Sequence, residues 1–263
     1  MSKKLTIATI KKRKGEKPLV MITAYDALFA KLLEPSADMI LVGDSLNMSF
    51  AGRSDTISTT LEQMIYHTNA VCKGAQNSFV VCDMPFGTYT CKENALENAI
   101  KVFQNTPADC VKIEGGRDKA EIIKHLTDNG IAVCGHIGLL PQSVRSEGGY
   151  KVKGKSADER EQLLRDAKAV EEAGAFCMVI EGTKADVAKE IAQSVTIPVI
   201  GIGAGADVDG QVLVFSDMLG LFEEFTPKFV KKYLDGATLV KNALKEYADE
   251  VVSRKFPTEE HIY

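Results

Sequence analysis

The sequence contains no tryptophan, 8 prolines and 4 histidines among 263 residues. No apolar run approaches the roughly 20 residues that cross a bilayer, so we expect no membrane partner. Its 6 cysteines form no C-x-x-C pair and mostly lie inside apolar runs, which favours small core residues over disulfides or a zinc site. Residues 1–17 lack the apolar stretch of a secretory signal, so we expect a cytoplasmic protein.

An excess of basic charge is also missing. Lys and Arg number 32 and Asp and Glu number 36, for a net charge of −4, so no overall basic field attracts nucleic acid. With 45% hydrophobic and 26% charged residues, the chain has the composition of a globular protein. We find no linker, repeat or low-complexity tract, and therefore predict one domain spanning 1–263.

Short apolar runs recur along the chain, and most are apolar on both alternations, as in parallel strands buried on both faces. The runs are 19–26, 39–45, 79–85, 110–115, 132–138, 176–182, 198–205 and 211–217. Segments with helical periodicity lie between many of them, at 61–74, 92–106, 118–130 and 158–174. Eight strands with mostly helical crossovers predict an α/β fold, a (β/α)8 TIM barrel, in preference to an open doubly wound sheet.

Three segments extend or disturb this pattern. Residues 5–15 predict an extra N-terminal helix, and residues 237–255 predict a long C-terminal one. Only ADVDG separates Gly205 from Gln211, which is too short for a crossover helix. Either the last apolar run is not a barrel strand, or a later stretch supplies that element.

The apolar runs end in polar side chains. Catalytic groups of barrel enzymes lie at the carboxyl ends of strands, whereas an unpaired buried charge inside a strand is costly. Lys112 and Glu114 are two residues apart, so both should point into the barrel mouth. The residues at these ends are Asp26, Asp44, Ser45, Asp83, Lys112, Glu114, His136 and Glu181.

Two of these residues suggest a metal. Asp44 and Asp83 end neighbouring strands, and adjacent carboxylates repel each other unless a cation or proton lies between them. Oxygen ligands alone suit Mg²⁺, and Glu114 could hold a metal-bound water. Zinc is less favoured, because His136 is the only candidate nitrogen ligand.

The sequence resembles the ketopantoate hydroxymethyltransferase family over nearly its whole length. The matching motifs are VGDSLNM (42–48), VCDMPF (81–86), VKIEGG (111–116), VCGHIGLLPQSV (133–144), GGYKVKGKS (148–156), VIEG (179–182), IPVIGIGAG (197–205), DGQVLVFSDMLG (209–220) and PKFVKKY (227–233). The resemblance implies a barrel of the phosphoenolpyruvate/pyruvate-binding superfamily. It also implies a place in pantothenate and coenzyme A synthesis, and a homo-oligomer, commonly a decamer.

The resemblance also implies roles for individual residues. It makes Glu181 the proton acceptor and places His136 in the same pocket. It assigns the binding of one Mg²⁺ per subunit to Asp44, Asp83 and Glu114, the last through water. It assigns contacts with the 2-oxo acid to Asp44, Ser45, Asp83 and Lys112.

The residues and the resemblance together predict one reaction. Mg²⁺ and the base allow an enolate to form at C3 of 3-methyl-2-oxobutanoate. The donor, 5,10-methylenetetrahydrofolate, and the product, 2-dehydropantoate, come from the resemblance alone. Two alternatives stay open: an enolate-forming lyase of the same superfamily, for which Cys91 is the only cysteine near a strand exit, and a non-catalytic metabolite-binding barrel.

Overall fold

The computed structural model describes residues 4–223 and 225–263. The chain divides into two compact units, the first ending at Val214 and the second spanning Phe215–Tyr263. The prediction of one domain over 1–263 stays a prediction, and its residues 1–3 and 224 lie outside the described ranges.

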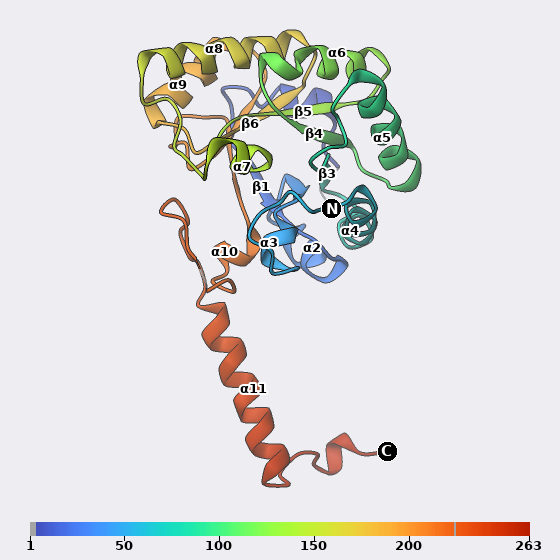
Figure 1. Ribbon diagram of the computed structural model, residues 1–263. Coiled ribbons are helices and arrows are strands. Elements are labelled where there is room, and N and C mark those ends of the chain that lie inside the picture. Colours follow the sequence, from blue (N-terminus) through green and yellow to red (C-terminus); the bar gives the residue numbers. More distant parts are fainter. Residues whose placement is uncertain (1–3, 224) are drawn as a thin grey trace. The chain divides into compact units, whose positions relative to one another are not determined.

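The first unit is a closed barrel of eight parallel strands in chain order, β1 to β8 (Figure 1). The strands are β1 (Leu19–Thr23), β2 (Met39–Val42), β3 (Phe79–Asp83), β4 (Cys110–Glu114), β5 (Val133–Gly138), β6 (Cys177–Glu181), β7 (Val199–Ile202) and β8 (Gly210–Leu213). Each begins within one residue of a predicted apolar run. The predicted (β/α)8 class is therefore confirmed.

Helices cover the outside of this barrel, and those predicted from periodicity are present. Thr60 and Gln63 form a capping box that starts α4 where its sequence pattern begins. The α-helices of the unit are α1 (Ile7–Lys11), α2 (Ala27–Leu33), α3 (Leu46–Ser49), α4 (Leu61–Gly74), α5 (Lys92–Asn105), α6 (Ala120–Asp128), α7 (Val144–Glu147), α8 (Ala157–Glu172) and α9 (Ala185–Ser194). Two 3₁₀ turns, η1 (Arg117–Lys119) and η2 (Pro141–Ser143), precede α6 and α7.

Side chains from every strand fill the barrel interior. The interior cluster includes Met21, Met39, Val81 and Ile200. Ile10 of α1 belongs to this cluster and is fully buried, so the predicted N-terminal helix is present, although it is shorter than residues 5–15. All six cysteines are free; those buried in the protein, as expected of core residues, are Cys82, Cys110, Cys134 and Cys177.

The connection between β7 and β8 corrects one expectation. The last apolar run does supply a barrel strand, because Gly210–Leu213 pairs with both β7 and β1. No later stretch takes its place in the barrel, and no helix lies between β7 and β8. Both alternatives drawn from the short ADVDG segment were therefore wrong. Two glycines with positive φ, Gly203 and Gly205, let the chain turn sharply, and the Asp209 carboxylate accepts a hydrogen bond from Val199 N at 2.9 Å.

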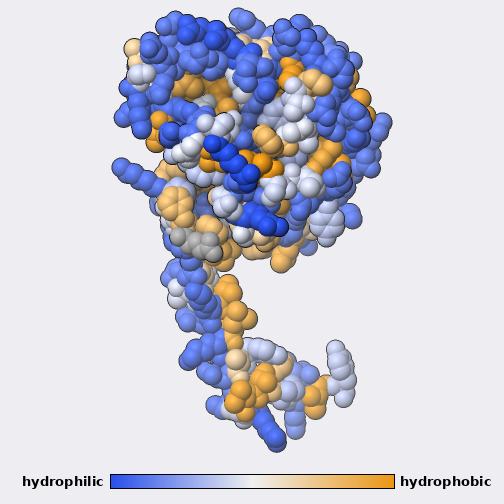
Figure 2. All heavy atoms as spheres, in the orientation of Figure 1, coloured by the Kyte–Doolittle hydropathy of each residue, from blue (hydrophilic) through white to orange (hydrophobic). Residues whose placement is uncertain are grey.

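The second unit contains α10 (Phe215–Met218), α11 (Gly236–Val252) and the 3₁₀ turn η3 (Glu259–His261). The helix predicted at 237–255 is thus present. Apolar side chains gather along α11 (Figure 2), and the exposed ones are Leu239, Val240, Leu244, Tyr247, Val251 and Val252. Within the described ranges, no helix combines the length and apolar character needed to cross a membrane.

Close packing of α4 against α2 gives a first testable prediction. A Cβ added at Gly74 would lie 2.1 Å from the carbonyl oxygen of Ala27. Because backbone has to move to relieve that overlap, we expect Gly74→Ala to lower the free energy of unfolding in urea by about 1–3 kcal/mol. The exposed neighbour Lys73 provides the control, since Lys73→Ala should change stability by less than about 0.5 kcal/mol. Equal stability of both variants and the wild type would contradict the packing.

Candidate active site

The predicted site residues continue the inward-facing stripes of four neighbouring strands. In each strand a core residue is followed, two positions later, by a polar one on the same face. These pairs are Val81 and Asp83, Cys110 and Lys112, Cys134 and His136, and Val179 and Glu181. Strand register aligns them further, because Asp83 lies opposite Lys112 and Glu114 lies opposite His136.

Lys112 stands at the centre of this group. Its Nζ lies 3.2 Å from Asp83 Oδ1 and 3.0 Å from His136 Nδ1, and the Lys112 side chain is only 4% exposed. The other carboxylate oxygen of Asp83 accepts a hydrogen bond from the backbone N of Asp44 at 3.1 Å. The ammonium that the sequence placed in the barrel mouth is therefore paired with a carboxylate there.

His136 links the Lys112 pair to two glutamates. Its Nδ1 lies 3.5 Å from Glu114 Oε1, and its Nε2 lies 3.3 Å from Glu181 Oε2 without hydrogen-bond alignment. Burial and the Lys112 ammonium lower the pKa of His136, but the two carboxylates outweigh them and raise it to about 9. The imidazole thus lies between two carboxylates and the Lys112 ammonium, and the carboxylates favour its protonated form.

The carboxylates differ in their electrostatics. Burial raises the pKa of Asp44 well above its usual range, and the charges of Asp83 and Glu114 raise it further. Burial also raises the pKa of Asp83, although Lys112 opposes this shift. Burial opposes ionisation of Glu114 as well, but contact with His136 brings its pKa below the usual value. Glu114 is thus the readily ionised carboxylate, and the two aspartates are stabilised as anions by added positive charge.

This donor set fits a magnesium ion. Asp44 and Asp83 are both buried, and burial is the main cause of their raised pKa values, so a cation between them would favour their ionised forms. In the part of the chain that the structure describes, no group of three or more His, Cys, Asp or Glu side chains is placed to hold a metal ion by itself. Mg²⁺ does not need one, because it commonly keeps several waters and binds through one or two carboxylates.

Three residues of the mouth were missed by sequence analysis. The Tyr25 hydroxyl shares a 2.8 Å hydrogen bond with Ser45 Oγ. This bond fixes the orientation of the predicted Ser45 side chain, next to Asp44 in the chain. Gln142, in η2, contacts both Asp44 and Glu114, and Tyr89 contacts Gln142. Neutral polar residues in loops carry no pattern that marks them; Gln142 could have been noticed only as part of the LLPQS segment.

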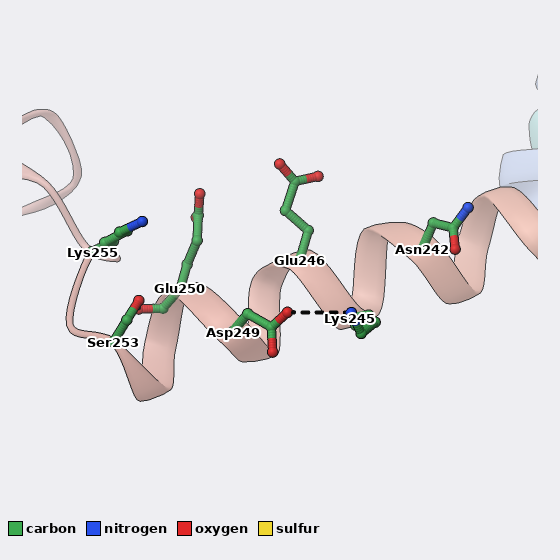
Figure 3. Close-up of a pocket in the computed structure, with 7 residues that line it drawn as sticks. All are labelled: Asn242, Lys245, Glu246, Asp249, Glu250, Ser253 and Lys255. Carbon is green, nitrogen blue, oxygen red and sulfur yellow. Dashed lines mark hydrogen bonds and ion pairs between the residues drawn. The ribbon is translucent and has the colours of Figure 1, made fainter.

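Two open hollows on the surface contain none of the predicted site residues. One lies along α11 and is lined only by polar side chains, including an ion pair of 3.7 Å between Lys245 and Asp249 (Figure 3). The other surrounds the exposed Cys91 at the start of α5, with Lys92 and Arg117. The barrel mouth remains the candidate site, because Asp83, Lys112 and His136 are buried there in mutual contact.

Comparison with known proteins agrees with this geometry. The family model of ketopantoate hydroxymethyltransferase matches residues 4–259. A curated relative from Sulfurimonas denitrificans, named 3-methyl-2-oxobutanoate hydroxymethyltransferase, is 78% identical over the whole of both chains. A relative of the same name from Helicobacter pylori strain P12 is 52% identical, covering 99% of this chain and 97% of its own.

Comparison with solved structures supports the fold. A phosphoenolpyruvate phosphomutase from Streptomyces platensis has a TM-score of 0.63 at 15% identity, covering 98% of this chain and 92% of its own. A phosphonopyruvate hydrolase in complex with oxalate and Mg²⁺ has a TM-score of 0.62 at 12% identity, covering 97% and 93%. The extent and identity of the sequence matches show that this chain belongs to the ketopantoate hydroxymethyltransferase family.

Proposed function

We propose that the barrel mouth transfers a hydroxymethyl group from 5,10-methylenetetrahydrofolate to 3-methyl-2-oxobutanoate, giving 2-dehydropantoate and tetrahydrofolate. The observation that carries this proposal is the contiguous arrangement of buried Asp83, Lys112 and His136 with the partly exposed Glu181, and with Asp44 and Glu114 beside them. It combines a carboxylate pair for a divalent cation, an ammonium for a carboxylate substrate, and a base at the edge of the group.

The proposed binding site for the 2-oxo acid follows from charge and hydrogen bonding. A 2-oxo acid presents a carboxylate and a keto oxygen, and charge-assisted hydrogen bonds hold such groups strongly. Lys112 supplies an ammonium that its buried partners keep protonated, since Asp83 and Glu114 raise its pKa against the effect of burial. Ser45, held by Tyr25, supplies a hydroxyl next to Asp44.

Asp44 and Asp83 are the proposed direct ligands of one Mg²⁺, with Glu114 acting through water. When bound, the ion would polarise the keto group and favour the negative charge that develops as the C3 proton leaves. The phosphonopyruvate hydrolase structure contains Mg²⁺ in a barrel of this shape, which supports the proposal only through the fold.

Glu181 is the proposed base. It is the most exposed member of the group, with 19% of its side chain accessible, so it can reach a substrate that enters the mouth. His136 Nε2 lies 3.3 Å from Glu181 Oε2, and attraction between the imidazole and the carboxylate holds Glu181 in place. Glu181 accepts the C3 proton, and C3 bonds to the methylene carbon of the folate. Both C–N bonds between that carbon and the folate break, and water supplies the oxygen of the hydroxymethyl group. The two folate nitrogens take up the C3 proton and one proton of the water, which gives tetrahydrofolate.

Product formation tests this proposal directly. Proton NMR of the purified protein with 3-methyl-2-oxobutanoate, methylenetetrahydrofolate and Mg²⁺ should show 2-dehydropantoate appearing, and none when either co-substrate or Mg²⁺ is omitted. Release of a shorter keto acid without folate would instead support the lyase alternative. Binding of the oxo acid with no reaction would support a metabolite-binding barrel.

Lys112→Met tests the proposed binding site of the 2-oxo acid. The substitution keeps the length of the side chain and removes its charge, so the dissociation constant of 3-methyl-2-oxobutanoate should rise by about tenfold or more, about 1.4 kcal/mol. Calorimetric titration measures this. Lys14→Met is the control, because it also removes an ammonium paired with an aspartate, Asp209, but outside the predicted site. Unchanged oxo acid affinity in Lys112→Met would reassign Lys112 to barrel structure.

Assembly and location belong to the same proposal. Family membership and the exposed apolar side chains of α11 support a homo-oligomer, which we propose to be a decamer. The partners are small molecules, a 2-oxo acid and a folate, rather than nucleic acid or membrane, and we propose a cytoplasmic location.

A further inference from the structure

We infer that Gln142 is a positioning residue that fixes the carboxylates of Asp44 and Glu114, with Tyr89 holding its amide in the orientation this requires. The inference deepens the proposed function, since it rests on these two carboxylates serving the magnesium site. Gln142 itself is not proposed to touch the metal or the substrate.

Gln142 joins two strands that are not adjacent in the barrel. Its side-chain Nε2 donates a hydrogen bond of 2.8 Å to Asp44 Oδ2, beyond the end of β2. Its backbone N donates one of 3.0 Å to Glu114 Oε2, at the end of β4. One residue of the loop after β5 therefore binds one oxygen of each carboxylate, and a shift of either carboxylate would break a bond to the same residue.

The remaining bonds of the amide leave it one orientation. The second Nε2 hydrogen is donated to the carbonyl oxygen of Met84, 2.9 Å away and next to Asp83 in the chain. The Met84 carbonyl can only accept, so a flipped amide would set its oxygen against a carbonyl oxygen. All hydrogen-bonding groups of this side chain, which is buried with the residue only 6% exposed, are thus engaged.

Tyr89 completes the arrangement from the other side. Its hydroxyl donates a hydrogen bond to Gln142 Oε1. A phenol carries its proton at neutral pH, so the Tyr89 hydroxyl can donate this bond. A donor at Oε1 and acceptors at Nε2 together prevent rotation of the amide.

A neutral donor is the chemistry that this position requires. Hydrogen bonds from an amide reduce the repulsion between buried carboxylates but add no positive charge that would compete with a cation. They also hold the ligand oxygens in place before the ion arrives, and outer residues of this kind commonly change metal affinity by about 10- to 100-fold. A residue that only packed the loop would change stability and leave metal affinity as it was.

The test compares metal affinity with metal-free stability. Gln142→Met keeps side-chain length and removes the amide, and Tyr89→Phe removes only the hydroxyl. We expect the calorimetric dissociation constant for Mg²⁺ to rise by about 10- to 100-fold in Gln142→Met and by a smaller factor in Tyr89→Phe. The control is Asn69→Leu. It removes a hydrogen bond of 2.7 Å that the Asn69 side-chain amide, in α4, donates to the carbonyl oxygen of Asn105, in α5. It should lower the melting temperature of the metal-free protein without changing Mg²⁺ affinity.

The possible failures are distinguishable. If the wild type binds Mg²⁺, Asp83→Asn does not, and both Gln142→Met and Tyr89→Phe bind as the wild type does, the role of Gln142 is overturned while the metal site stands. The role is also overturned if Asn69→Leu loses Mg²⁺ affinity as much as Gln142→Met, since the loss would then follow stability. If the wild type binds no Mg²⁺, or Asp83→Asn binds it unchanged, the metal site and this inference fall together.

Discussion

Glu181→Gln should lower turnover by about 10²–10⁴-fold, the contribution that a positioned general base typically makes. Glutamine keeps the shape and hydrogen-bonding capacity of the side chain, but it cannot accept the C3 proton. Calorimetric affinities for Mg²⁺ and for 3-methyl-2-oxobutanoate should stay close to those of the wild type, because Glu181 lies at the edge of the group and contacts His136 rather than the aspartates. Steady-state kinetics and the two titrations together check this prediction.

The same exchange elsewhere in the barrel provides the control. Glu171, in α8, is 15% exposed and is paired with Lys168, so Glu171→Gln also removes a partly buried, paired carboxylate. It should leave turnover unchanged. Loss of binding together with rate in Glu181→Gln would assign Glu181 a metal or structural role, and His136 would become the next candidate for the base.

Asp83→Asn should abolish turnover and strongly weaken Mg²⁺ binding while the barrel stays folded. Asp83 is buried and is one of only two proposed direct ligands, so the neutral amide removes half of the charge available to the ion. The fold should persist because the buried Lys112 ammonium is still close to the negative charges of Glu114 and Asp44. Calorimetry with Mg²⁺ and far-ultraviolet circular dichroism measure the two outcomes.

Asp209→Asn serves as the matched control for this variant. Asp209 is also largely buried, with 8% of its side chain exposed, and it pairs with Lys14 at 2.7 Å just before β8 begins. We expect this substitution to reduce stability without any change in Mg²⁺ affinity. Equal Mg²⁺ affinity of Asp83→Asn and the wild type would show that the ion binds elsewhere.

The sequence was sufficient to predict the barrel and the charged side chains at the ends of β3 to β6, and the physical reason is the same for both. A strand buried on two faces is apolar throughout, so the first charged side chain on its inward face marks the point where the strand reaches solvent or substrate. Lys112 and Glu114 illustrate this, since their spacing of two residues predicted a shared face and the structure places both among the buried charges.

Two features could not be predicted, because each depends on contacts between distant segments. The helix-free connection of β7 to β8 depends on glycine turns and on the bond from Val199 N to Asp209. Gln142 gives no local indication of its role, since only the fold brings an amide of η2 to the carboxylates of β2 and β4. Periodicity identifies buried faces, whereas a neutral hydrogen-bonding residue in a loop has no periodic partner.

The central claim is that Glu181 removes the C3 proton of a 2-oxo acid with the help of Mg²⁺ held by Asp44 and Asp83. Exchange of that proton in deuterated buffer, followed by NMR without any folate, tests it most directly. We expect exchange by the wild type to require Mg²⁺ and to fall by about 10²–10⁴-fold in Glu181→Gln. Exchange by Glu181→Gln at the wild-type rate, or exchange by the wild type that is indifferent to Mg²⁺, would contradict it.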